Sequence, residues 1–234
     1  MVTPMSYRNF ALPTFGALLV LFFFMLVIFL PFMIIGLIGR ALSNFGLSWG
    51  SFIIFLFVSL IGSTINLPVW RSKVASAVQT VEYVYFFGMR YPVPTTRTRF
   101  MESVISINFG GAIMPVLLSV YLLLMNPQAA VPSLAAIPIV SAILYFAAKP
   151  VKGVGIVTPL FIPPIVAAIV GIILGGSHSP VVAYVAGTIG CIVGADLLHL
   201  GSLDDMGAVN LSIGGAGTFD GIFLTGLLAA LLAF

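Results

Sequence analysis

The chain has 234 residues, of which 61% are hydrophobic and only 6% are charged, and its formal net charge is +3. Soluble domains carry about 25% charged residues, so a water-soluble fold of this size could not hide so much apolar surface. The composition therefore predicts a multi-pass protein of the cytoplasmic membrane whose main partner is lipid. The scattered basic residues argue against a nucleic-acid surface.

Seven apolar stretches are interpreted as membrane-spanning helices of an all-α fold. They cover residues 14–39, 47–68, 101–124, 133–148, 156–175, 181–200 and 211–233. The first stretch is too long for the core of a signal peptide and lacks a small-residue cleavage site, so we expect it to be retained. Residues 1–234 are expected to form one transmembrane domain.

The basic residues predict how the chain is oriented. With seven spans, Arg40 alone falls on the side opposite the N-terminus, and eight basic residues share the N-terminal side: Arg8, Arg71, Lys73, Arg90, Arg97, Arg99, Lys149 and Lys152. Because positively charged loops stay in the cytoplasm, we expect a cytoplasmic N-terminus and an external C-terminus.

The longest polar segment, residues 69–100, separates the second and third predicted spans. Its stretch VEYVYFFGMRYPVP is rich in aromatic and β-branched residues and has Gly88 near its middle. This pattern predicts a small cytoplasmic β-hairpin, which either lies on the membrane surface or contacts a substrate.

Two short segments resemble one another. SINFGGAIMP (residues 106–115) and SIGGAGTFD (residues 212–220) both place Ser-Ile shortly before Gly-Gly-Ala, once a two-residue gap is allowed. Small residues are common where membrane helices meet, so both chance and an internal repeat explain the likeness.

Two of the six carboxylates, Asp196 and Asp220, fall within predicted spans. A charge in the middle of a membrane costs several kcal/mol, about +3 on insertion scales, so each must be neutralised, paired or functional. In plain helices they would lie about 6 Å and about 13 Å below the surface, and an unwound glycine segment would bring the two depths together. Their spans are joined by a short loop, which predicts antiparallel neighbours with facing carboxyls.

Three roles for such a pair remain open. Two carboxyls about 3–5 Å apart in an apolar pocket share a proton, so one can activate water while the other protonates a carbonyl oxygen. Alternatively, the two acids bind protons or cations in a transporter or channel whose last span is a discontinuous helix. In the third interpretation, hydrogen-bonded acids simply hold helices together.

Other residues of the predicted site are polar, small or helix-breaking. We expect four of them to line the site or contact substrate: Gly215, Gly217, Asn108 and His199. The alternative interpretation of Asn108 is a hydrogen bond between helices, and that of His199, three residues after Asp196, is an interfacial residue that simply reaches water. No spacing of His or Cys predicts a metal site, and no cofactor is expected.

The glycines ahead of Asp220 resemble the GxGD-type intramembrane aspartyl proteases, the presenilin and signal-peptide-peptidase group. The resemblance implies that Asp220 is the aspartate of the glycine motif, that Asp196 is its partner, and that a transmembrane peptide is the substrate. The stretch TPLFIPP (residues 158–164) resembles the proline-bearing turn of that group, which implies that Pro163 and Pro164 line the site. Here Thr218 and Phe219 separate Gly217 from Asp220. As a whole, the chain is similar to a family of uncharacterised prokaryotic integral membrane proteins that end in GADLL…IGGAGTFDGIFL, a likeness that implies no activity.

Overall fold

The computed structural model describes residues 14–151, 155–202, 210–215 and 221–233. The chain divides into two compact units, residues 1–40 and 41–234. In the first unit the structure describes most of helix α1 (Thr14–Phe45), whose side chains from Leu18 to Ile35 are exposed. A helix that is apolar all round and exposed in this way is the form expected of a segment that lipid covers.

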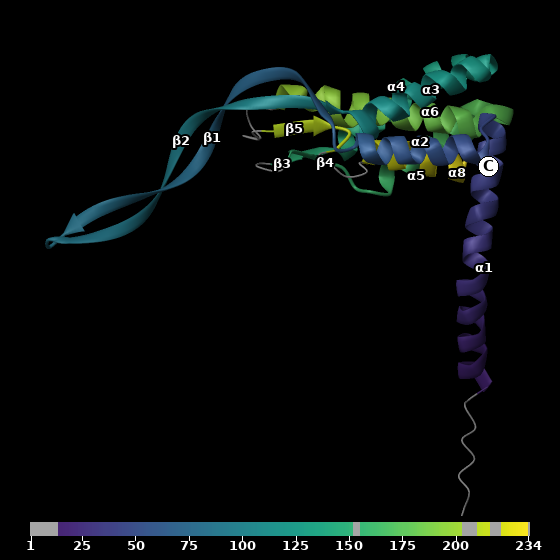
Figure 1. Cartoon of the computed structure of the whole chain (residues 1–234), viewed down its shortest axis with the longest axis horizontal. Helices are drawn as coiled ribbons and strands as arrows, with labels where there is room; N and C mark the ends of the chain where they lie inside the picture. The colour runs from purple at the N-terminus through teal and green to yellow at the C-terminus, as the bar shows by residue number, and fades with distance from the viewer. Residues whose placement is uncertain (1–13, 152–154, 203–209, 216–220, 234) are drawn as a thin grey trace, which may run out of the picture. The chain divides into compact units, whose positions relative to one another are not determined.

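The described part of the second unit contains six further α-helices, which lie side by side (Figure 1). None of the six contains a charged residue. Their bounds are α2 (Trp49–Gly62), α3 (Met114–Met125), α4 (Ala130–Ala147), α5 (Ile162–Gly175), α6 (Ser179–Cys191) and α8 (Gly221–Leu232). Three 3-10 turns adjoin them at Pro127–Ala129, Gly176–His178 and Leu197–Ser202.

Helix α6 is the centre of the core. It packs against α3, α4, α5 and α8, and every residue from 180 to 188 is buried. The ring of Tyr184 meets the ring of Phe45 edge to face, with the centroids 5.6 Å apart. A Cβ on Gly171 of α5 would lie 2.6 Å from the Cβ of Ala183, so glycine is what lets these two helices approach closely.

Three helical stretches among the described residues are long and apolar enough to cross a membrane: Leu18–Ser43, Pro127–Ala147 and Ile162–Ser202. The last stretch contains α5 and α6, which pack along one another after a turn at Gly176, where φ is +53°. Helices α2 and α8 have 14 and 12 residues. At 1.5 Å per residue they are roughly 21 and 18 Å long, shorter than a hydrocarbon core of about 30 Å. The described residues thus form a largely helical structure with three candidate membrane-spanning stretches, and the arrangement of seven spans stays a prediction.

The all-α prediction is wrong in one respect, because the described chain also contains two β-sheets. Strands β1 (Asn66–Phe86), β2 (Met89–Asn108) and β5 (Asn210–Ile213) form one sheet in the order β1-β2-β5. In it β1 and β2 are antiparallel, and β2 and β5 are parallel. Strands β3 (Lys149–Val151) and β4 (Gly155–Val157) form an antiparallel pair. The strands follow α2, α4 and α6 in the chain, and β5, β3 and β4 lie at the same end of the helices (Figure 1).

The predicted hairpin is confirmed, but it is longer than residues 69–100. Strands β1 and β2 pair from Asn66 with Asn108 to Phe86 with Met89. Phe87 and Gly88 both have positive φ, 51° and 77°, as a two-residue primed turn requires. Residues 101–108 were assigned to the third span because an apolar run does not by itself distinguish a strand from a helix.

Two other predicted spans also begin as strand. The fifth, 156–175, starts in β4, and its helix begins at Ile162. The seventh, 211–233, starts in β5, and its helix begins at Gly221. After β5, Gly214 and Gly215 both have a φ of +87°, a left-handed conformation that an α-helix does not contain.

Candidate functional site

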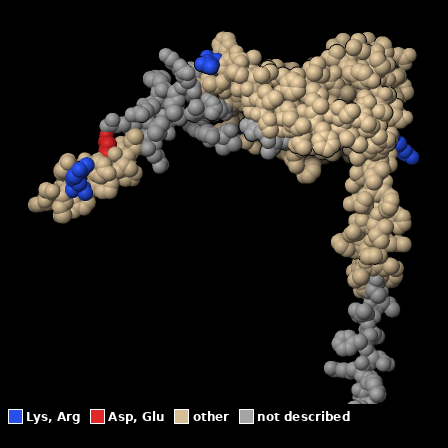
Figure 2. Space-filling view, in the orientation of Figure 1, with Lys and Arg blue, Asp and Glu red and all other residues tan. Residues whose placement is uncertain are grey.

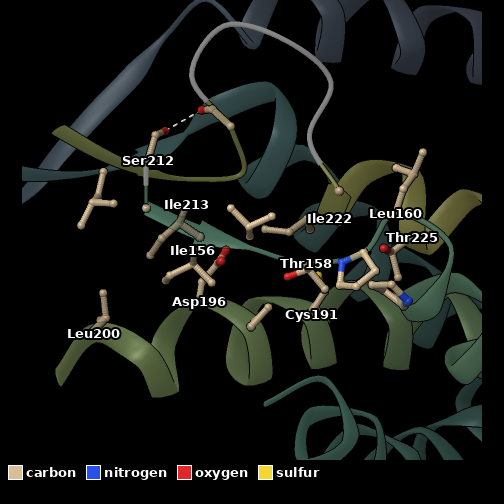
Figure 3. A pocket seen from close by; sticks show the side chains of 18 of the residues that line it. Ile156, Thr158, Leu160, Cys191, Asp196, Leu200, Ser212, Ile213, Ile222 and Thr225 are labelled. Carbon is tan, nitrogen blue, oxygen red and sulfur yellow. Dashed lines mark hydrogen bonds between the residues drawn. The ribbon is translucent and has the colours of Figure 1, made fainter. Parts of the chain in front are cut away.

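A cavity of about 440 Å³ lies inside the second unit, where the strands meet the helix ends (Figure 3). Its walls come from β4, β5, the beginnings of α5 and α8, and the end of α6. Most of the lining side chains are apolar, among them Ile105, Ile156, Leu160 and Ile222. Ligand sites commonly measure about 300–1,000 Å³ and have mainly apolar walls, so both size and lining suit a binding site.

Asp196 is the one charged residue among the described residues that line this cavity, and its carboxyl group points into it (Figure 3). It is the last residue of a π-helical turn (Ile192–Asp196) that continues α6. Gly194 of this turn packs against α4 so closely that an added Cβ would clash with the carbonyl oxygen of Ser141. The widened turn thus sets the direction of the aspartate, and π turns often occur at functional sites.

Two strand edges form another part of the wall. Gly155, Ile156 and Val157 make up β4, and Leu211, Ser212 and Ile213 belong to β5; all six line the cavity. Strand β5 is the last strand of its sheet, and β4 belongs to a sheet of two strands. Edge strands carry main-chain N–H and C=O groups that an added extended peptide can pair with.

Asn108 joins three elements behind the cavity. Its side chain is fully buried; Nδ2 donates to the carbonyl of Ser63 at 2.6 Å and to Oδ1 of Asn66 at 3.0 Å. Its Oδ1 accepts from the main-chain N–H of Gly111 at 2.7 Å. Asn108 therefore connects the end of α2, the start of β1 and a π-helical turn (Phe109–Ile113) that leads into α3.

Ser212 extends this polar cluster to the cavity wall. Its hydroxyl lies 2.7 Å from Oδ1 of Asn66 and 2.6 Å from the carbonyl oxygen of Gly215, so a single donor serves two acceptors. Ser212 and Gly215 both line the cavity. The conformation of the chain just after β5 is thereby tied to the base of the hairpin.

The two segments that resemble one another in sequence are neighbours in the structure. Ser106 pairs with Ser212 and Ile107 with Ile213 in the parallel β2–β5 ladder. Beyond the strands, the main chains touch, since a Cβ on Gly111 would clash with the carbonyl oxygen of Gly214. Each segment is a strand followed by glycines and then a helix, so their likeness extends to structure.

The predicted site residues fall into three groups: those that line the cavity, those outside the described residues, and those that are buried away from the cavity. Gly215 and Pro163 line it, as does Asp196. Asp220 and Gly217 lie outside the described residues. Gly221, which directly follows Asp220 in the chain, lines the cavity as well.

Asn108, Pro164 and His199 are buried but are not among the residues that line the cavity. Asn108 bonds the main chain as described above. Nδ1 of His199 lies 3.0 Å from the carbonyl oxygen of Ala195, and its ring centroid lies 4.7 Å from that of Tyr145. These contacts match the interpretation of Asn108 as a bond between elements, and they make His199 a packed residue.

Several residues of the cavity had no signal in the sequence. Cys191 is buried and lines the cavity directly before the π-helical turn, and Thr158 and Thr225 contribute hydroxyl groups to the lining (Figure 3). Each is isolated among apolar residues, so only the packing of α5, α6 and α8 reveals the shared site. Among the described residues, no group of three His, Cys, Asp or Glu side chains is placed to hold a metal ion.

Residues 60–232 match a family described as Protein of unknown function (DUF1614). The chain belongs to this family. The matched region runs from the end of α2 into the last turn of α8 and so contains all the elements that line the cavity. No curated protein and no solved structure matches the chain.

Proposed function

We propose that the protein is an intramembrane hydrolase that cleaves peptide bonds with a pair of carboxyl groups, Asp196 and Asp220. The observation that carries the proposal is the lining of the cavity. Asp196 points into it, and Gly215 and Gly221, the residues that bracket the segment containing Asp220, line the same space. This common lining supports the idea that both acids serve one site.

The chemistry follows from a shared proton. The ionised carboxylate takes a proton from a water molecule as that water attacks the carbonyl carbon of the peptide, and the protonated carboxyl donates to the carbonyl oxygen. A carboxyl then protonates the peptide nitrogen, the C–N bond breaks, and the products are an amine and a carboxylic acid. The balance requires only water.

The substrate we propose is an extended, apolar polypeptide segment. The edges of β4 and β5 supply main-chain partners for an added strand, and the apolar walls suit a transmembrane sequence. Glycine at positions 155, 215 and 221 leaves room for a main chain to approach the acid.

The orientation is part of the proposal. We propose seven membrane-embedded helical segments with the N-terminus and the strand-bearing end on the cytoplasmic side of the cell membrane. The uncharged helices and the position of the basic residues between them support this arrangement. The cavity would then open near the cytoplasmic surface, where water is within reach.

The test is cleavage of a panel of fluorescently tagged transmembrane peptides by the full chain in vesicles. Asp196→Asn and Asp220→Asn should each lower the rate by about 10²–10⁴-fold, the range for loss of a general acid or base. Asp204→Asn and Asp205→Asn remove the same charge elsewhere in the chain and should leave the rate unchanged. Cleavage at the wild-type rate by both site variants, with unchanged melting temperatures, would refute the catalytic role.

A second function, proton- or cation-coupled transport, is favoured by one observation. Asp196 is half-buried and lies where the regular α-helix gives way to a π-helical turn and then a 3-10 turn, and non-α backbone around an acid within the membrane is typical of ion sites in transporters. This function predicts a pH-driven flux across vesicles that Asp196→Asn abolishes, with no peptide cleavage. Loss of thermal stability in the variants, without cleavage or flux in the wild type, would indicate a structural pair instead.

A further inference from the structure

The far end of the β1–β2 hairpin exposes a cluster of aromatic residues. Phe87 at the turn is 87% exposed, and its neighbours Tyr85, Phe86 and Met89 are each more than half exposed. The rings of Phe86 and Phe87 meet edge to face, with centroids 4.8 Å apart, so they form one apolar tip. Isolated exposed apolar residues are ordinary, but a contiguous apolar tip indicates a binding surface.

A basic residue accompanies these rings. The guanidinium carbon of Arg90 lies 4.6 Å from the ring centroid of Tyr83 and 5.8 Å from that of Tyr85. Aromatic rings beside Arg or Lys are the combination found where proteins meet lipid headgroups, because the rings enter the interface and the cation meets phosphate.

The charge of the chain is concentrated on the same hairpin. Between Asn66 and Asn108 there are five basic and two acidic residues, and the rest of the chain has four of each, so the whole net charge of +3 belongs to the hairpin. Figure 2 shows basic side chains and an acidic side chain on the hairpin, and a largely uncharged surface over the neighbouring helices. A positively charged arm with an aromatic tip is complementary to an anionic membrane surface.

The hairpin is also long enough to extend along a membrane surface. Strand β1 has 21 residues, so at about 3.3 Å per residue the hairpin is roughly 70 Å long. Its base is joined to the end of α2 through Asn108 and Ser63. An arm of this length that begins at the end of a membrane helix can lie along the bilayer in which that helix resides.

We propose that the hairpin tip, residues 83–91, binds the anionic headgroup layer of the membrane that holds the helices. The tip anchors the hairpin to the bilayer surface on the side where the cavity lies. This interaction is independent of the proposed hydrolysis, because no residue of the tip lines the cavity.

The experiment places an environment-sensitive fluorophore at the tip of the full chain in vesicles. Met89→Cys keeps both phenylalanines and provides the labelled position, Thr96→Cys provides a control farther along the same strand, and wild-type protein with buried Cys191 provides the labelling background. Vesicles contain phosphatidylcholine alone or with phosphatidylserine, and nitroxide-bearing lipids measure proximity by quenching.

We expect the label at position 89 to shift to shorter wavelength and to be quenched at least twofold more than the label at position 96. Arg90→Gln should reduce the quenching in anionic vesicles, since a basic residue near such a surface contributes about fivefold in binding. Replacing Phe86 and Phe87 by Ser should abolish the difference, whereas Val93→Ser, another exposed apolar position, should not.

Three results would overturn the proposal. Equal quenching at positions 89 and 96 would mean that the tip is no closer to lipid than the middle of the strand. Quenching only by nitroxide lipids in added protein-free vesicles would assign the tip to an opposing membrane. Disulfide crosslinking between two copies of the Met89→Cys variant, in place of lipid quenching, would assign the tip to self-association.

Discussion

The segments Ser106–Met114 and Ser212–Gly221 begin alike and end differently. Both leave neighbouring parallel strands at a Ser-Ile pair. In the first, Asn108 bonds three groups and a helical turn begins at once with Phe109. In the second, two glycines with positive φ follow, and the described helix α8 begins at Gly221.

The two segments also differ in whether they contribute residues to the cavity wall. In the first segment the fully buried side chain of Asn108 hydrogen-bonds to its surroundings, and none of the residues beyond the strand lines the cavity. The second contributes Gly215 and Gly221 to the cavity wall and contains Asp220 between them. Of these two similar segments, only the second contributes residues to the cavity wall.

The largest effect is expected where the main chains of the two segments touch, at Gly111 and Gly214. Gly111→Ala should cost about 3 kcal/mol of stability, because its Cβ would collide with the main-chain carbonyl of Gly214, which cannot rotate away. Thermal unfolding in detergent measures the loss. Gly201→Ala, which meets nothing within 4 Å, is the matched control, and equal melting of the two variants would contradict the packing described here.

Loss of the Asn108 hydrogen bonds should lower the stability slightly less than Gly111→Ala does. Asn108→Ala leaves the Ser63 carbonyl and the Gly111 N–H without a partner in a buried place, which should cost about 2 kcal/mol. Asn126→Ala removes a single, partly buried side-chain bond to Leu122 and should cost well under half of that. Hydrogen exchange at the main-chain N–H of Gly111 would show whether the loss of stability is local. Unchanged protection of this N–H in Asn108→Ala would argue against its hydrogen bond to Asn108.

The smallest change in stability is expected for Ser106 and Ser212, which occupy paired positions in the two strands and can therefore be compared directly. Ser212→Ala removes the hydroxyl between Asn66 and Gly215 and should cost about 1 kcal/mol. The hydroxyl of Ser106, at the paired position, makes no hydrogen bond among the described residues, so Ser106→Ala should be nearly neutral. If the two substitutions shift the melting temperature equally, the two segments do not differ in the way proposed.

Part of this architecture was predictable from local pattern. The turn at Gly88 and the aromatic, β-branched residues around it indicated a hairpin, since both are local signals. The extension of β2 to Asn108 was not predictable, because VISIN is apolar and suits a helix as well as a strand. Of the site, Asp196, Gly215 and Pro163 were identified as unusual residues in apolar surroundings, whereas Thr158 and Thr225 are ordinary in isolation.

Composition alone determined that the chain belongs in a membrane, because so little charge cannot make a water-soluble surface of this size. It also marked the acids, since a carboxyl group is conspicuous wherever its neighbours are apolar. Only the tertiary structure decided that Ser106 lies beside Ser212, and that Asp196, Cys191 and Thr225 line one cavity. Strand register and cavity walls depend on contacts between residues far apart in the chain, and these contacts leave no periodic trace in the segments that make them.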